Sequence, residues 1–213
     1  MNFTIHEKLK KAKHSIDESL NSLELQNQLL RFGFSAGRIK EGKELLERAS
    51  KYYQDYKHQS ALEYDCNNDL YQKKEVSHQT YVEHLRQIKP VLKNQQRFWK
   101  ELEAAEFNAK GMKGWIQKLQ DFYQLLLNDG YYLSRIQLHG LDKSEFQKGL
   151  CQIILLQQAY QKQQKMSWET RRTRHKLEQA MHEFENWNIN FKSQMQLALL
   201  EFKDTRKLST SRN

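Results

Sequence analysis

Glutamate and histidine occur once at the spacing of a metal-binding helix. Glu75 and His78 form a Glu-x-x-His sequence. In di-iron helical bundles this sequence occurs on two helices, and two further helices each supply a glutamate. The corresponding segment of the second half, residues 181–185, does not repeat the spacing. Such a site needs two copies of the Glu-x-x-His sequence, and the chain has one. We therefore predict no metal site and no cofactor.

Motifs for nucleophilic or phosphate chemistry do not occur in the sequence, which has no nucleophile elbow, no phosphate-binding loop and no HExxH. Cys66 and Cys151 form no CxxC pair. We expect them to be reduced thiols in or near the core. The sequence therefore predicts a protein that is not an enzyme, with no catalytic residues.

Positive charge is concentrated in the second half of the chain. The net charge is +9, and residues 1–107 carry 18 basic and 16 acidic side chains, against 17 and 10 in residues 108–213. Trp168 lies within the densest basic segment. The basic residues of this segment, called the basic stripe below, are Lys162, Lys165, Arg171, Arg172, Arg174 and Lys176.

Two interpretations of the basic stripe remain open. Exposed, it would bind phosphates of nucleic acid or of an anionic membrane surface, with an affinity that falls as salt rises. Alternatively it pairs inside the molecule with an acidic segment of the first half, where ion pairs would fix the register of two helices. The acidic residues of that segment are Asp55, Glu63, Asp65 and Asp69.

Aromatic residues near predicted helix ends are candidates for a contact surface. Phe98 and Trp99 follow Arg97, and Tyr131 and Tyr132 follow Gly130. Exposed aromatics at such places are typical of protein interfaces. We therefore predict that these four side chains belong to a partner surface.

The composition predicts that helices position all of these residues. The chain of 213 residues has one proline and eight glycines, and long stretches contain neither. No apolar run approaches the roughly 18 residues needed to span a bilayer. The N-terminus has no apolar run of a secretion signal. We expect an all-α, cytoplasmic protein without a transmembrane segment.

A weak internal repeat relates the two halves of the chain. Residues 20–60 align without gaps with residues 127–167, 107 positions later, so that Gly33 matches Gly140 and Gly42 matches Gly149. Each copy of a doubled helical unit leaves an apolar face that the other can cover. We predict two quasi-equivalent repeats, residues 1–107 and 108–213, related by a pseudo-twofold axis and packed together as one elongated domain.

Capping residues recur at the start of the long helical segments. Gly33 can end one helix in the left-handed conformation and Ser35 can cap the next. The second copy has Gly140 and Asp142, and Glu145 completes a capping box in the broad sense. Residues 92–107 are expected to form a helix between the copies, followed by a break at Gly111 and Gly114.

Each copy then contains an apolar seam with a polar centre. In the second copy the seam has the spacing of a coiled coil and includes Leu177, Met181, Phe184, Phe191 and Met195. Two geometries fit the polar centre. Each copy is either a helical hairpin, turning at residues 65–69 in the first copy, or one helix of more than about 50 residues.

The glycine segments resemble a known pattern. Gly33, Phe34, Ser35, Ile39, Gly42 and Leu45 follow the form G-(F/Y)-(S/T)-x3-I-x2-G-x2-L. This pattern is similar to that of an uncharacterised bacterial family of about 200 residues with tandem helical units. Leu141 and Phe146 depart from it in the second copy. The resemblance implies the fold and implies no activity.

Together these features predict a non-catalytic function. We expect a structural or protein-interaction helical bundle that self-associates or joins a larger assembly. The alternative is binding of nucleic acid or an anionic membrane through the basic stripe.

Overall fold

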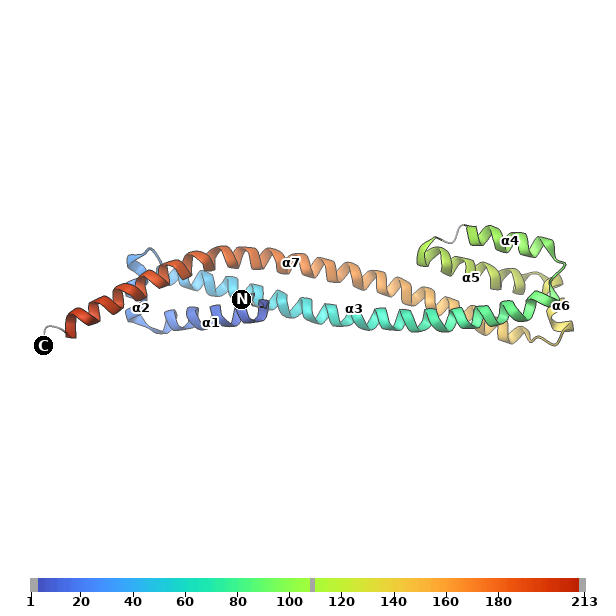
Figure 1. Ribbon diagram of the computed structural model, residues 1–213, viewed down its shortest axis with the longest axis horizontal. Coiled ribbons are helices and arrows are strands. Elements are labelled where there is room, and N and C mark those ends of the chain that lie inside the picture. The colour runs from blue at the N-terminus through green and yellow to red at the C-terminus, as the bar shows by residue number, and fades with distance from the viewer. Residues whose placement is uncertain (1–3, 108–109, 211–213) are drawn as a thin grey trace. The chain divides into compact units, whose positions relative to one another are not determined.

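The chain folds into α-helices. The computed structural model describes the backbone of residues 4–107 and 110–210 and the side chains of residues 4–103 and 110–201. Within these residues there is no strand, so the all-α prediction is confirmed. The helices are α1 (Ile5–Asn21), α2 (Leu23–Arg31), α3 (Ala36–Val91), α4 (Gln96–Phe107), α5 (Gly111–Asn128), α6 (Gly130–Leu138) and α7 (Lys143–Thr210), as Figure 1 shows.

Helix boundaries recur along the chain at the offset found in the sequence. α2 begins at Leu23 and α6 at Gly130, 107 positions later. α3 begins at Ala36 and α7 at Lys143, again 107 positions apart. The predicted repeat therefore has a counterpart in the order and starting points of the helices. The pseudo-twofold arrangement stays a prediction.

The same glycine turn ends α2 and α6. Gly33 has a φ of 79° and Gly140 a φ of 76°, in the left-handed region that favours glycine. After Gly33, the backbone N–H of Phe34 donates to the carbonyl of Leu29 at 3.0 Å. The equivalent bond follows Gly140, so both turns are Schellman motifs. The predicted glycine caps are confirmed.

The two long helices begin with side-chain caps. The Ser35 hydroxyl accepts from the N–H of the third residue of α3 at 3.3 Å, as predicted. Asp142 caps α7 through the N–H of Ser144, at 3.0 Å. The capping box predicted with Glu145 is wrong, because the Asp142 side chain accepts from Ser144 and the Glu145 carboxylate accepts from Lys148 at 2.6 Å.

Both long helices continue through the polar centre of their seams. α3 has 56 residues and passes without a turn through positions 65–69. α7 has 68 residues. Of the two geometries that fit the sequence, the structure therefore contains the long helix. Gly111, with a φ of 67°, begins α5, whereas Gly114 lies inside that helix and makes no break.

The chain forms two compact units. Unit 1 comprises residues 1–60 and 169–213, and thus α1, α2, the first part of α3 and the last part of α7. Unit 2 is the continuous stretch 61–168, with the rest of α3 and α7 and all of α4, α5 and α6. Each unit therefore takes helices from both predicted repeats. The boundary between the two predicted repeats, after residue 107, is drawn from the sequence alone and stays a prediction.

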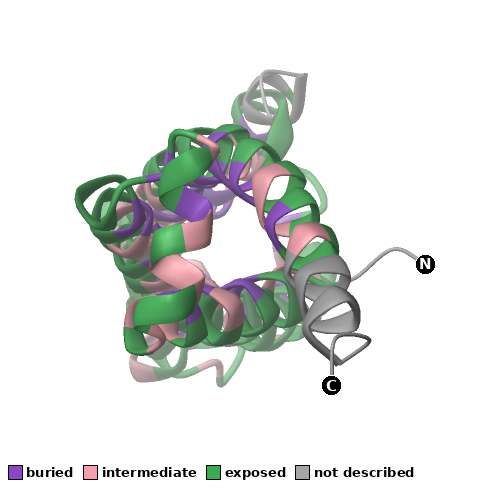
Figure 2. Cartoon of the chain, turned by 90° about the vertical axis from the view of Figure 1, so that its left-hand side faces the viewer, coloured by how far each residue is buried: buried purple, intermediate pink, exposed green. Residues whose placement is uncertain are grey.

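The core of unit 1 lies among its four helical segments. In Figure 2 unit 1 faces the viewer, with buried residues on the inner sides of its helices. The Trp187 ring of α7 lies directly against Gly42 of α3, where any Cβ would overlap the indole. The largest fully buried side chains here are Ile16, Leu29, Ile39, Phe184 and Phe191.

The core of unit 2 is richer in aromatic rings. Phe98 of α4 and Phe122 of α5 are fully buried, and Tyr81 of α3 meets Phe122 edge to face at 4.9 Å. At Gly149 of α7, the glycine equivalent to Gly42, the ring of Tyr123 occupies the space of a side chain. The two glycines thus admit rings from different helices, so the packing at these two positions differs.

Candidate functional site

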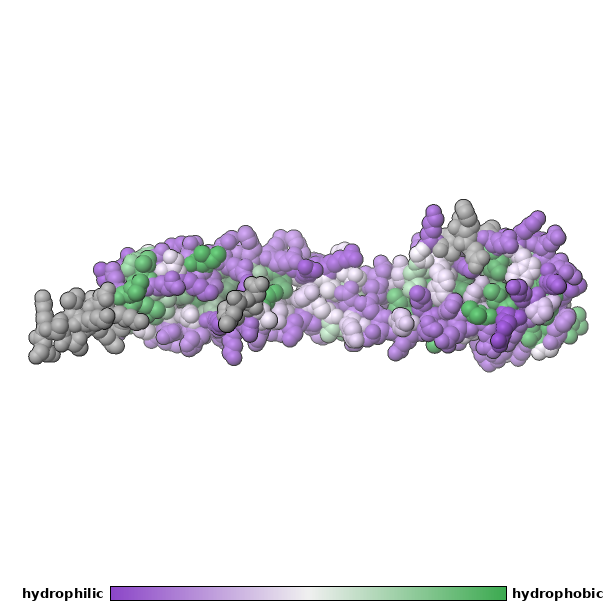
Figure 3. All heavy atoms as spheres, in the orientation of Figure 1, coloured by the Kyte–Doolittle hydropathy of each residue, from purple (hydrophilic) through white to green (hydrophobic). Residues whose placement is uncertain are grey.

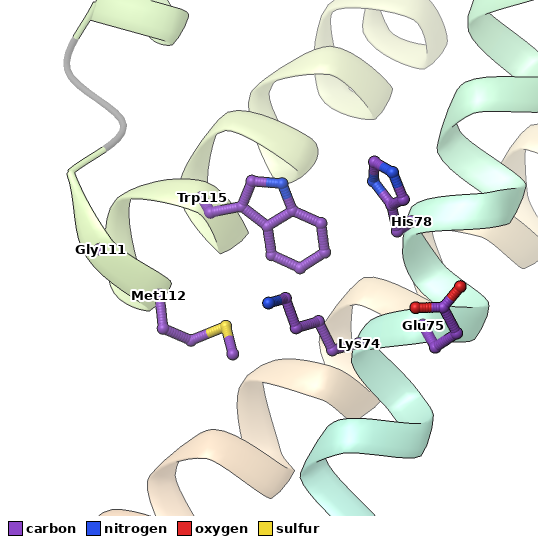
Figure 4. Close-up of a pocket in the computed structure, with 6 residues that line it drawn as sticks. All are labelled: Lys74, Glu75, His78, Gly111, Met112 and Trp115. Carbon is purple, nitrogen blue, oxygen red and sulfur yellow. The ribbon is translucent and has the colours of Figure 1, made fainter.

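A surface pocket of unit 2 contains the Glu-x-x-His sequence. Its volume is about 540 Å³. Figure 4 shows its lining, which consists of Lys74, Glu75 and His78 from α3 and Gly111, Met112 and Trp115 from α5.

Trp115 forms the apolar wall of this pocket. Lys74 and His78 are one turn apart on α3, so they face the same neighbour. The Lys74 amine lies 5.8 Å from the centre of the Trp115 ring, and the His78 ring lies 6.1 Å from it (Figure 4). A cation over an indole face contributes about 0.5–1 kcal/mol at an exposed site. These contacts hold the start of α5 on α3.

The pocket brings together one carboxylate and one imidazole. Within the described residues, no group of three or more His, Cys, Asp or Glu side chains is placed to hold a metal ion. Glu75 and His78 are both exposed, and His78 is engaged with Trp115. The geometry supports a helix-docking role for this cluster better than a chemical one.

A second polar pair is buried in the core of unit 2. Nδ1 of His84 lies 3.0 Å from the hydroxyl of Tyr123, and the Phe146 ring is 4.7 Å from the imidazole. Burial lowers the pKa of His84, and Glu83 and Glu145 oppose this effect. Burial also raises the pKa of Tyr123. The pair is therefore a neutral hydrogen bond.

Acid should destabilise unit 2 through His84. Its pKa is below the ordinary 6.5 when folded, so the unfolded chain binds more protons as the pH falls through 6.5. The free energy of unfolding should therefore decrease below that pH. His84→Gln should reduce this pH dependence, measured by urea denaturation between pH 5 and 8. His78→Gln, which removes an exposed histidine of the same helix, should retain it. An unchanged slope in His84→Gln would refute the assignment.

The basic stripe is exposed along α7. Lys162 and Lys165 belong to unit 2 and the other four residues to unit 1. Arg174 pairs with Glu178 on its own helix at 2.9 Å, and Asp69 pairs with Lys73 on α3. Arg174 and Asp69 thus each pair with a residue one turn away on their own helix, and both interpretations of the basic stripe stay predictions.

Most of the predicted partner-surface aromatics are not exposed. Phe98 and Tyr132 have exposed fractions of 0% and 4%, so their assignment to a surface is wrong. Trp99 is half-buried and its indole N–H donates to the Leu92 carbonyl at 2.8 Å. Tyr131 is 52% exposed. The α4 and α6 aromatics instead close the core, since Phe98 and Tyr132 meet edge to face at 5.3 Å.

Unit 1 exposes an apolar surface that the sequence did not predict. Leu23 and Leu30 share one side of α2, and the Arg31–Glu201 ion pair of 2.9 Å places the end of α2 beside α7. Figure 3 shows apolar side chains gathered at this end of unit 1. We define the unit 1 apolar surface as Leu23, Leu30, Ile189, Leu197 and Leu200, with exposed fractions of 73%, 58%, 66%, 44% and 61%.

Comparison of the chain with protein-family models, with curated proteins and with solved structures finds no match. The resemblance to a tandem helical family therefore stays a prediction. Among the described residues, no helix carries an apolar stretch long enough to cross a bilayer.

Proposed function

We propose that this chain is a non-catalytic, self-associating helical protein whose contact surface is the unit 1 apolar surface. The observation that carries the proposal is the exposure of five large aliphatic side chains on two adjacent helices. A grouped apolar surface of this kind marks an interaction site more often than scattered exposed residues do.

The size of this surface predicts weak association. Burying a leucine completely contributes about 1.5–3 kcal/mol, and each of these side chains is already partly covered. Association costs an estimated 4–15 kcal/mol in lost freedom. The free energy gained from five aliphatic contacts exceeds this cost by little. The assembly should therefore form in a concentration-dependent way.

Charge at the surface is consistent with contact between copies. The chain has a net charge of +9, which opposes the approach of identical chains. The unit 1 apolar surface carries the matched pair Arg31–Glu201 at its edge. This ion pair adds no net charge to the edge of the surface.

Replacing Leu30 and Leu200 with glutamate should abolish self-association. Sedimentation velocity over a concentration series should show a rising mass for the wild type and a monomer for the double variant. Leu138→Glu, at an 84% exposed leucine of unit 2, is the matched control and should associate like the wild type. A wild-type chain that stays monomeric at all concentrations would overturn the proposal.

The exposure of the basic stripe favours a second function, binding to a polyanion such as nucleic acid. All six basic residues are exposed, and Trp168 among them is 60% exposed. Aromatic and basic side chains together are typical of nucleic-acid surfaces.

Changing Arg171, Arg172 and Arg174 together to glutamine tests this second function. If the stripe binds phosphates, the wild type should retain DNA in a salt-dependent manner and the triple variant should lose most of that retention. The melting temperature of the variant is the control for folding. Absence of DNA binding by the wild type at low salt would exclude this function.

A further inference from the structure

Two exposed tyrosines and two exposed asparagines share one side of α3 in unit 2. Tyr64 and Tyr71 have exposed fractions of 66% and 68%. They are seven residues apart, or about 10.5 Å along a helix, and therefore lie on the same side of α3. Asn67 and Asn68 are each one turn from both tyrosines and are also exposed. We call these four residues the tyrosine platform.

The tyrosine platform lies on the side of α3 that α5 covers further along. Tyr71 precedes His78 by two helical turns, and the His78 ring lies 6.1 Å from the Trp115 ring of α5. Tyr64 and Tyr71 are therefore in line with the contact between α3 and α5. Because α5 begins at Gly111, beside His78, the platform lies beyond the start of α5 (Figure 1).

α7 adds an aromatic ring and an amide to the same surface. Gln120 of α5 donates to the Gln157 side chain of α7 at 2.8 Å, which marks the side of α7 that faces α5. Gln164 and Trp168 follow Gln157 by two and by three helical turns, so they lie on this side as well. Gln164 is exposed and Trp168 is 60% exposed. All of these residues belong to unit 2.

The surface combines aromatic rings with amides and has no exposed aliphatic side chain between them. Residues 157–168 contain no leucine, isoleucine or valine, and the only one in residues 63–71 is Leu70, which is buried. An apolar helix laid on the platform would leave the amides of Asn67 and Asn68 buried without partners. A sugar hydroxyl both donates and accepts, so it can satisfy either end of an amide. The C–H groups of a sugar ring also pack on the electron-rich face of an aromatic ring.

The charges of the tyrosine platform favour an uncharged ligand. Residues 64–71 contain no lysine, arginine or histidine and include Asp65 and Asp69. A nucleic-acid backbone bound along this stretch would find no positive partner for its phosphates. The platform therefore differs in chemistry from the basic stripe.

The pocket beside Trp115, called the Trp115 pocket below, lies at the end of the platform. Its volume of about 540 Å³ is within the range of small-molecule sites, about 300–1,000 Å³. Lys74 and His78 point toward the Trp115 ring in Figure 4. Their nitrogen atoms can hydrogen-bond the hydroxyl groups of a sugar held against the indole. Since Tyr71 lies one turn before Lys74, a chain of sugars can run from this pocket onto the platform.

We propose that the tyrosine platform and the Trp115 pocket bind a neutral oligosaccharide with an extended, β-1,4-linked chain. The spacing of about 10.5 Å between Tyr64 and Tyr71 is close to the two-residue repeat of such a chain. Alternate sugar rings then stack on successive aromatic side chains. Asn67 and Asn68 bond the hydroxyl groups of the ring between them. This site is separate from the unit 1 apolar surface and does not depend on self-association.

Isothermal titration calorimetry with defined hexasaccharides tests this site. The wild type should bind cellohexaose or chitohexaose, which are β-1,4-linked. It should bind maltohexaose, whose α-1,4-linked chain is curved, at least about tenfold more weakly. Because the ligand is neutral, raising the salt concentration should leave the affinity unchanged.

Tyr71→Ala should lower the affinity for the β-1,4-linked hexasaccharide by about tenfold or more, because one stacking face is lost. Tyr71→Phe keeps the ring and should retain most of the affinity. Tyr131→Ala is the matched control, since it removes a 52% exposed tyrosine elsewhere in unit 2. It should bind like the wild type.

Failure of the wild type to bind either β-1,4-linked hexasaccharide would overturn the inference. So would wild-type affinity in both Tyr71→Ala and Tyr64→Ala. Tyr64 and Tyr71 are exposed, so the variants should keep the wild-type circular dichroism spectrum, and Tyr64→Ala replaces Tyr71→Ala if the latter unfolds. Binding of a thymidine oligonucleotide in place of the sugars, lost in Tyr71→Ala, would assign the platform to nucleic acid and contradict the inference. None of these outcomes bears on sedimentation of the wild type, which tests the proposed function separately.

Discussion

Replacing Phe98 with alanine should lower the free energy of unfolding of unit 2 by about 3–5 kcal/mol. The ring is fully buried, and it contacts Trp99, Phe122 and Tyr132 at centre distances of 5.1, 6.4 and 5.3 Å. Alanine would leave a cavity among rings that belong to three helices. Urea denaturation followed by circular dichroism measures the loss.

Tyr131→Ala is the matched control for Phe98→Ala. Tyr131 is 52% exposed, and its side chain lies outside the core of unit 2. We expect a loss below about 1 kcal/mol, as for most surface substitutions. Equal losses for the two variants would contradict the assignment of Phe98 to the core.

Gly42→Ala should destabilise unit 1 by about 3 kcal/mol, at the upper end of the usual cost of overpacking. The added methyl group would overlap the Trp187 ring, which lies between Phe184 and Phe191 and cannot easily move. The indole must therefore be displaced from the core. The expected result is a lower midpoint of urea denaturation and a red shift of tryptophan fluorescence.

Gly37→Ala provides the control on the same helix. A Cβ at Gly37 would meet only the Ser35 hydroxyl, at an ordinary 3.7 Å. Alanine should therefore leave stability unchanged or raise it by up to about 1 kcal/mol. A neutral Gly42→Ala variant would show that Trp187 does not depend on the glycine.

Local features of the fold could be predicted because they depend on nearby residues. Gly33 and Gly140 supply the left-handed conformation that ends a helix, and Ser35 supplies the oxygen that begins one. The seam of α7 could be predicted because its apolar residues recur at coiled-coil spacing. The helix break predicted at Gly114 was wrong, because one glycine inside a helix costs only about 1 kcal/mol, which packing offsets.

Features that depend on contacts between distant segments could not be predicted. An aromatic residue near a helix end suits a core as well as an interface, and Phe98 became a core residue because α4 packs on α5. Ser77 and Gln152 are 75 positions apart in the sequence, yet they line the same pocket. The pocket forms because α3 and α7 run antiparallel (Figure 1). Leu30 was not singled out because periodicity marks an apolar side of a helix without showing whether another helix covers it.

The way the two units divide the chain has a consequence for biosynthesis. The first 60 residues emerge from the ribosome early in translation. The segment of α7 that completes their core begins only at residue 169. Residues 61–168 form a continuous unit that can close before translation ends. The leucines and isoleucines of the N-terminal helices therefore stay exposed until α7 has been synthesised. Molecular chaperones bind emerging chains that expose such apolar side chains.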